Sequence, residues 1–263
     1  MIIIWGETHL GKQNVIKEEM QCPQCNKDTI LSSYTARAWF TLYFMPLIPL
    51  ARFRAMLYCA SCKQFYKIKP SKVPTQIAET LQEFGKALGE GDTEEIAGNI
   101  YHLLRLGAFA EADTAIDQTR QAGLARMANL TAGHAARKRS MPRVAEEYFV
   151  GILHEDPNDA EARMALGELY LGTKRRDEGI EQLRYACQLA PEALDARGTL
   201  ADALVARKQW AEAREVLEEM IAIEPAVMDN KPFAKLMKKV RKKAPAPVAI
   251  EPKTPQDNPY AVG

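Results

Sequence analysis

Four of the five cysteines in this 263-residue chain stand in two Cys-x-x-Cys pairs near its start. The first pair is Cys22 and Cys25, and the second is Cys59 and Cys62. Each such turn places two sulfurs on one side of a tight loop, and two facing turns form a cage of four thiolates. Four thiolates leave no open position for a reacting water, so the pattern predicts a structural rather than a catalytic Zn²⁺ site.

Other uses of these cysteines fit the pattern to different degrees. Iron in a rubredoxin-like site has the same ligands, and the sequence does not distinguish iron from zinc. A redox-active dithiol is disfavoured, because thioredoxin-type motifs come singly at the start of a helix. Clustering of four cysteines, with Cys187 alone far away, favours metal binding in a reducing compartment over a disulfide framework. In the first turn, Pro23 fixes a suitable backbone angle and Asn26 tolerates a left-handed conformation.

Short runs rich in β-branched and aromatic residues flank the pairs, and each run predicts a strand. The runs are residues 2–5, 29–31, 39–44, 56–58 and 65–68. About 70 residues form only a small core, so a bound metal would supply much of the folding free energy. We expect the apolar segment 45–50, Met-Pro-Leu-Ile-Pro-Leu, to cover that core; an exposed docking loop or a membrane contact is the alternative.

The N-terminal apolar run, the two cysteine pairs and the Pro-Leu-Ile-Pro-Leu segment between them resemble a microbial family of small zinc-ribbon domains. The resemblance implies a β ribbon that binds zinc. It implies no settled activity.

The second half of the chain carries a repeat, marked by Pro157, Pro191 and Pro225, which fall 34 residues apart. Apolar residues recur inside each period at helical spacing, as Leu166 does at Leu200. A fixed period of this length predicts a pair of helices per unit, and neighbouring units must stack to bury their apolar faces.

This pattern resembles the tetratricopeptide repeat, with two clear units and two more degenerate ones from about residues 93 and 126. The resemblance implies an all-α array whose concave surface, lined by the first helix of each unit, holds a protein partner as an extended peptide or a helix. By analogy, the residues facing that groove are Met127, Leu130, His134, Arg137, Lys138, Glu161, Met164, Glu168, Leu171, Asp195, Asp202 and Val205.

A proline-containing boundary at residues 67–74 separates the two parts. The predicted fold is therefore multidomain: a small β zinc ribbon over 1–70, followed by an all-α tetratricopeptide-like array over 75–225 with about four repeats. A basic capping helix follows over 226–243, and the proline-rich tail 244–263 is predicted to be disordered. Thr75 is the expected N-cap of the first helix, over 76–88. We expect the ribbon to fold independently, so that Cys25→Ser would unfold residues 1–70 and leave the array intact.

Composition sets limits on function. A formal net charge of +1 does not indicate a nucleic-acid or membrane partner for the chain as a whole. The sequence shows no secretory signal and no apolar run long enough to span a bilayer, which favours the cytoplasm. It also lacks a catalytic motif, so no enzyme activity is predicted. The predicted function is that of a zinc-binding adaptor or scaffold for protein partners. The alternative is a nucleic-acid-binding protein that uses the ribbon and the basic C-terminal helix.

Overall fold

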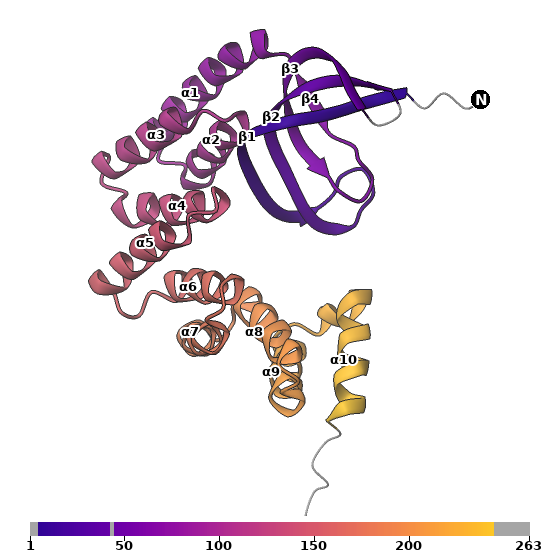
Figure 1. The fold of residues 1–263 in the computed structure, drawn as a ribbon. Coiled ribbons are helices and arrows are strands. Elements are labelled where there is room, and N and C mark those ends of the chain that lie inside the picture. The colour runs from indigo at the N-terminus through magenta and orange to yellow at the C-terminus, as the bar shows by residue number, and fades with distance from the viewer. Residues whose placement is uncertain (1–4, 43–44, 245–263) are drawn as a thin grey trace, which may run out of the picture.

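The computed structural model describes residues 5–42 and 45–244 and shows a β-sheet followed by an array of helices (Figure 1). The sheet is antiparallel, with its strands side by side in chain order: β1 (Trp5–Gln21), β2 (Asp28–Leu42), β3 (Met45–Cys59) and β4 (Tyr66–Ile68). This confirms the predicted two-part fold. The predicted strand over 2–5, except for Trp5, the last two residues of the run 39–44, and the predicted tail from residue 245 lie outside the described residues.

The first three strands are far longer than the runs that predicted them. Each contains register shifts, such as those between Leu10 and Gln13 in β1 and between Ser32 and Tyr34 in β2. A bulge inserts a residue and bends the strand, so the alternation of apolar and polar residues restarts and one strand looks like several short ones. The expectation that residues 45–50 form a covering loop is wrong, because they form the exposed first half of β3.

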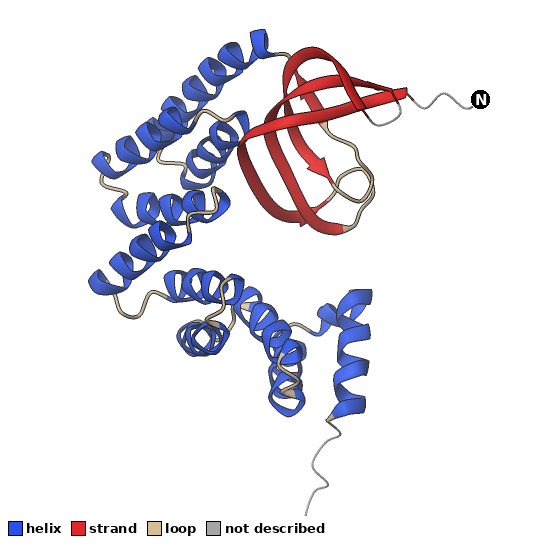
Figure 2. Cartoon of the chain, viewed as in Figure 1, coloured by secondary structure: helices blue, strands red, loops and turns tan. Residues whose placement is uncertain are grey.

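The helical part contains ten α-helices within the described residues (Figure 2). They are α1 (Val73–Glu90), α2 (Thr93–Leu106), α3 (Phe109–Gln121), α4 (Ala125–Lys138), α5 (Pro142–Glu155), α6 (Ala160–Gly172), α7 (Arg176–Leu189), α8 (Leu194–Ala206), α9 (Trp210–Ile223) and α10 (Lys231–Lys243). Thr75 is not the N-cap of α1: the helix begins two residues earlier, with Pro74 in its first turn. None of these helices combines the length and the apolar composition that crossing a membrane requires.

Hairpins of consecutive helices pack closely where one partner is small. A Cβ on Gly133 of α4 would lie 2.3 Å from the ring of Phe149 in α5. In the next hairpin Gly167 faces Gly179, and a Cβ on Gly179 would lie 2.9 Å from the carbonyl oxygen of Gly167. At this crossing even a methyl group on Gly179 would clash with the backbone of the neighbouring helix, so the position requires glycine.

The sheet packs on the first helices of the array. Ile16 of β1 is 1% exposed and belongs to the same apolar core as Phe84 of α1, Ile100 and Leu103 of α2 and Ala132 of α4. This shared core does not fit the expectation of two independent folding units, because unfolding the sheet would expose apolar surface of α1, α2 and α4 to water.

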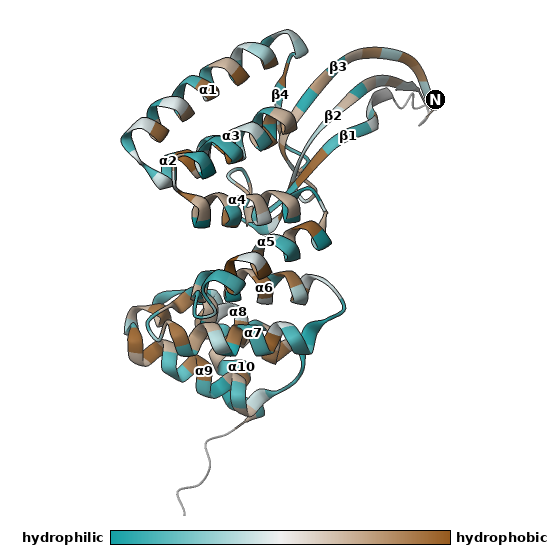
Figure 3. Cartoon of the chain, turned by 90° about the vertical axis from the view of Figure 1, so that its left-hand side faces the viewer, coloured by the Kyte–Doolittle hydropathy of each residue, from teal (hydrophilic) through white to brown (hydrophobic). Residues whose placement is uncertain are grey.

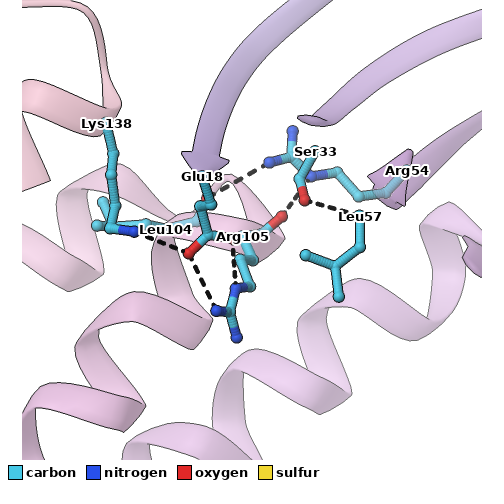
Figure 4. A network of polar contacts seen from close by, with 7 residues as sticks. All are labelled: Glu18, Ser33, Arg54, Leu57, Leu104, Arg105 and Lys138. Carbon is cyan, nitrogen blue, oxygen red and sulfur yellow. Dashed lines mark hydrogen bonds and ion pairs between the residues drawn. The ribbon is translucent and has the colours of Figure 1, made fainter. Parts of the chain in front are cut away.

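A buried carboxylate next to Ile16 reinforces this packing (Figure 4). Glu18 of β1 is 5% exposed and accepts hydrogen bonds from Arg105 Nε at 2.7 Å and Nη2 at 3.0 Å, and from Lys138 Nζ at 3.0 Å. Burial alone would raise the pKa of Glu18, but the hydrogen bond from Arg105 and the positive charge of Lys138 lower it. The carboxylate therefore stays ionised at neutral pH and links β1 to α2 and α4.

Arg54 of β3 makes a second polar link between the sheet and the array. Its side chain is 2% exposed, and burial lowers its pKa to about 10. The guanidinium donates to the carbonyl oxygens of Arg105 at 2.7 Å and Leu104 at 3.3 Å, and also to Asn14 O at 2.9 Å and Thr35 Oγ1 at 3.2 Å. It thus places a positive charge at the C-terminal end of α2, where the helix dipole favours a cation.

Candidate metal centre and groove

Two matching turns position the four cysteines. In the first turn the Cys22 N–H donates to Lys27 O at 2.9 Å, and the Asn26 N–H donates to Cys22 O at 2.8 Å. The same two bonds recur in the second turn, where Cys59 is the counterpart of Cys22 and Lys63 that of Asn26. Asn26 has φ 51° and Lys63 has φ 64°. The left-handed conformation predicted at Asn26 is confirmed, and both turns aim their sulfurs at one point.

The distances between sulfurs match a tetrahedral metal site. The sulfur of Cys22 lies 3.8 Å from that of Cys62, and the sulfur of Cys25 lies 3.9 Å from that of Cys59. All four sulfurs are within 4.8 Å of one another. A tetrahedron with Zn–S bonds of about 2.3 Å requires sulfurs about 3.8 Å apart. The four cysteines are therefore close enough to bind one metal ion.

The surroundings of Cys59 favour a thiolate. Cys22 and Cys59 are buried and pack against Leu31. The backbone N–H of Cys62 has the largest influence on the Cys59 thiol; with the N–H of Ser61 it lowers the pKa of Cys59 to about 6, against the opposing effect of burial. A thiolate, not a thiol, is the form that binds a metal. In Cys25 and Cys62 the backbone N–H groups of Lys27 and Gln64 lower the pKa of the thiol, but burial and hydrogen bonds with neighbouring thiols outweigh them and raise it.

A groove of about 710 Å³ lies between the sheet and the array. Its helical wall includes five of the residues predicted for the groove: Arg137, Lys138, Glu168, Leu171 and Asp202. They come from α4, α6 and α8, the first helices of three consecutive hairpins. The opposite wall consists of Lys17, Glu18 and Glu19 of β1 and Ile30 of β2. This second wall was not predictable from the sequence, because nothing local to β1 indicates that it faces α4.

Charged pairs connect the groove residues across elements. Arg137 of α4 donates to Glu168 of α6 at 2.5 Å, and Lys138 is held by Glu18. For Lys17, Glu19 and Asp202 the described residues provide no such partner. These last three side chains are exposed and are therefore the charges available to a ligand.

The other predicted groove residues lie elsewhere. Four are in or against the apolar cores of the array: Leu130 is buried, and Met127, Met164 and Val205 are half-buried. Two are exposed at the starts of helices. Glu161 in the first turn of α6 forms an ion pair with Arg126 at 2.9 Å, and Asp195 is in the first turn of α8.

His134 packs inside its hairpin. Its ring lies edge-on to Phe149 with ring centroids 5.2 Å apart. Burial, together with the positive charges of Arg137 and Lys138, lowers its pKa from 6.5 to about 4.

The low pKa of His134 predicts a loss of stability in mild acid. Between about pH 6.5 and pH 4 the unfolded ring binds a proton that the folded ring does not, so the free energy of unfolding falls as the pH falls, by up to about 3 kcal/mol. Urea unfolding of the wild type and of His134→Gln across this range should show a shallower slope for the variant. His154→Gln, at an exposed histidine, is the control; equal slopes for wild type and His134→Gln would contradict the prediction.

A family model described as tetratricopeptide repeat matches residues 177–240, from the start of α7 into α10. This part of the chain carries tetratricopeptide repeats. No curated protein matches the sequence.

Several solved structures are similar to the helical part. The first tetratricopeptide domain of Spaghetti, bound to an HSP90 peptide, is 16% identical, covers 44% of this chain and 93% of that chain, and has a TM-score of 0.40. YrrB, a repeat protein described as having an unusual peptide-binding site, is 20% identical, with coverages of 62% and 88% and a TM-score of 0.44. A mutant O-GlcNAc transferase from Thermobaculum terrenum is 21% identical, with coverages of 49% and 22% and a TM-score of 0.39. The assignment of the repeats rests on the family model and on the hairpins themselves.

Proposed function

We propose that this chain is a non-enzymatic adaptor that binds a peptide segment of a protein partner in the groove between the sheet and the array. The observation that carries the proposal is the groove itself: α4, α6 and α8 present their side chains to one hollow of about 710 Å³, and β1 closes its other side. Tetratricopeptide repeats generally mediate protein interactions, and a groove of this kind accepts an extended or helical segment.

The charges of the groove favour a partner segment of mixed charge. Lys17 would attract an acidic side chain, whereas Glu19 and Asp202 would attract basic ones. In this proposal Arg137 and Glu168, which already pair with each other, shape the groove and do not bind the ligand.

We propose that Zn²⁺, held by Cys22, Cys25, Cys59 and Cys62, has a structural role in this zinc-ribbon-like sheet. Support comes from the sulfur distances and from the lowered pKa of the Cys59 thiol. The site lies directly after β1, so a metal there would fix the strand end that forms the groove wall. A reducing compartment such as the cytoplasm would keep the thiols available.

Selection of peptides from a displayed random library on the full-length, zinc-loaded protein tests the groove. Peptides that bind should lose about tenfold in affinity or more towards the double variant Lys17→Glu/Asp202→Lys, because two of the three free charges reverse, one on each wall. The control is Lys238→Glu/Lys239→Glu/Lys242→Glu on α10, which should leave peptide affinity unchanged.

The opposite pattern would refute the proposal. Peptide binding that survives the groove variant shows that the groove is not the binding site. Binding of single-stranded RNA or DNA that is lost in the α10 variant and not in the groove variant would favour the nucleic-acid alternative, in which basic side chains contact phosphates.

A further inference from the structure

The end of the sheet farthest from the helices (Figure 1) carries large apolar side chains that are exposed. They belong to residues 45–50 at the start of β3, which we call the apolar arm. Met45 is 60% exposed and Ile48 is 55% exposed, and Leu47 and Leu50 are also exposed. Figure 3 shows this arc of β3 as a hydrophobic band that points away from the array. Adjacent exposed side chains of this size indicate an interaction surface.

The backbone of the apolar arm is poorly suited to pair with another strand. β4 pairs only with Arg54–Met56 of β3, so the arm is an edge of the sheet. Pro46 and Pro49 have no N–H to donate, and prolines on an edge prevent strand addition. A partner of the arm must therefore contact its side chains. The missing N–H groups also lower the cost of placing this edge in an apolar medium.

Two arginines lie directly behind the arm. Arg37 of β2 and Arg52 of β3 are cross-strand partners, and both are exposed. Neither side chain makes an ion pair or hydrogen bond with the described residues. Like charges placed opposite each other repel, and a bound anion would remove the repulsion. The two side chains line a hollow of about 280 Å³ that also includes Trp39. The sequence has no Asp or Glu between Asp28 and Glu79, so no acidic group of this segment competes for them.

We propose that the apolar arm docks into the interface of a lipid bilayer with anionic headgroups, and that Arg37 and Arg52 bind those headgroups. Four residues along a strand, from Ile48 to Arg52, span about 13 Å. Amphipathic segments bury their apolar side chains about 5–10 Å into the boundary between headgroups and acyl chains. The arm thus reaches the acyl boundary while the arginines remain among the headgroups, and Trp39 lies between them, at a level where tryptophan is favoured.

Charge complementarity favours an anionic membrane over a second copy of the chain as the partner of the apolar arm. Two copies meeting at this surface would bring Arg37 and Arg52 of each towards the same two cations of the other, which is unfavourable. An anionic membrane has the opposite charge. The docking surface is separate from the groove, so it does not depend on the proposed adaptor function.

Vesicle co-sedimentation of the full-length protein tests the proposal. The probes are vesicles of phosphatidylcholine alone and of phosphatidylcholine mixed with phosphatidylglycerol. We expect binding to the mixed vesicles only. In the variant Arg37→Gln/Arg52→Gln, the loss of each arginine should weaken the affinity for mixed vesicles about fivefold, because one basic residue near an anionic surface contributes about that much. Leu47→Ser/Ile48→Ser should abolish binding.

The control is Lys238→Gln/Lys239→Gln, which removes two exposed charges from α10 and should sediment like the wild type. Equal weakening by this control would mean that binding follows overall charge, and the arm would have no special role. Absence of sedimentation with mixed vesicles, or equal binding to both vesicle types, would overturn the proposal. So would concentration-dependent dimerisation in analytical ultracentrifugation that Leu47→Ser/Ile48→Ser abolishes, because a second copy would then cover the arm.

Discussion

Loss of the metal that we propose for the four-cysteine site should unfold the sheet and also weaken the helices that pack on it. Among the described residues, the core next to the site consists of Cys22, Leu31 and Cys59, with three half-buried neighbours. Without a metal this end has few apolar contacts to hold it, and structural zinc sites contribute about 10–16 kcal/mol of apparent binding free energy. Cys59→Ser should release the metal and lower the stability of the protein by several kcal/mol.

The packing of the sheet against the array determines which helices are destabilised when the metal is lost. Ile16 and Glu18 of β1 lie within six residues of Cys22. Ile16 packs in the apolar core shared with α2 and α4, and Glu18 pairs with a charged side chain of each of these helices. Disorder at the end of β1 therefore exposes apolar surface on those helices. Amide hydrogen exchange should show lower protection in α2 and α4 of Cys59→Ser and unchanged protection in α8 and α9, whose core is a separate cluster.

Elemental analysis of the purified wild type measures the metal directly and distinguishes zinc from iron. Cys187→Ser is the matched control: Cys187 lies in α7, away from the site, and its loss should leave the metal content intact. Unchanged exchange in α2 and α4 after metal loss would show that the sheet and array are independent units, as the sequence alone suggested.

Features set by short-range chemistry were predictable from the sequence. The facing Cys-x-x-Cys turns and the left-handed Asn26 each depend on a few neighbouring residues. The repeats were visible for a similar reason, because each unit contacts mainly its neighbours in sequence, and the same small and large positions recur in every period.

Contacts between distant segments were not predictable in this way. Lys138 and Glu18 are 120 residues apart, and Arg54 binds the end of α2 about 50 residues away. In the sequence Glu18 and Arg54 look like solvated charges of the small N-terminal domain, and Lys138 looks like a residue that faces the groove of the array. The groove shows the same limit: the analogy placed Arg137 and Asp202 in its wall, whereas the sheet wall with Lys17 and Glu19 had no local signal.

Replacing Arg54 by methionine should destabilise the protein by about 3 kcal/mol. Methionine fills part of the space, but the carbonyl oxygens of Arg105 and Asn14 lose their donor in a buried setting, and each unsatisfied group costs about 1–3 kcal/mol. Urea unfolding monitored by circular dichroism measures the change. Arg52→Met, two residues away on the same strand but exposed, is the control and should shift stability by no more than about 0.5 kcal/mol. Similar effects of the two substitutions would mean that the buried hydrogen bonds of Arg54 contribute nothing.

Alanine substitutions at two glycines, compared with each other, measure the contribution of the contact between Arg54 and the array. Gly91 and Gly107 each follow a helix in the left-handed conformation, with φ of 72° and 82°. A Cβ on Gly91 would meet no atom within 4 Å, whereas a Cβ on Gly107 would lie 3.0 Å from Arg54 Nη1. Alanine at either position pays the backbone cost of about 1–2 kcal/mol, but only Gly107→Ala also displaces the guanidinium.

The extra cost at Gly107 should therefore disappear when Arg54 is already methionine, because no guanidinium remains to be displaced. In a double-mutant cycle, the double variant Arg54→Met/Gly107→Ala should lose less unfolding free energy than the sum of the losses in the two single variants. For Arg54→Met/Gly91→Ala the loss should equal the sum of the two single losses. Additivity in both cycles would show that α2 does not depend on Arg54 for its C-terminal end. Non-additivity at Gly107 alone would show that the buried side chain of Arg54 contributes to the coupling between the sheet and the array.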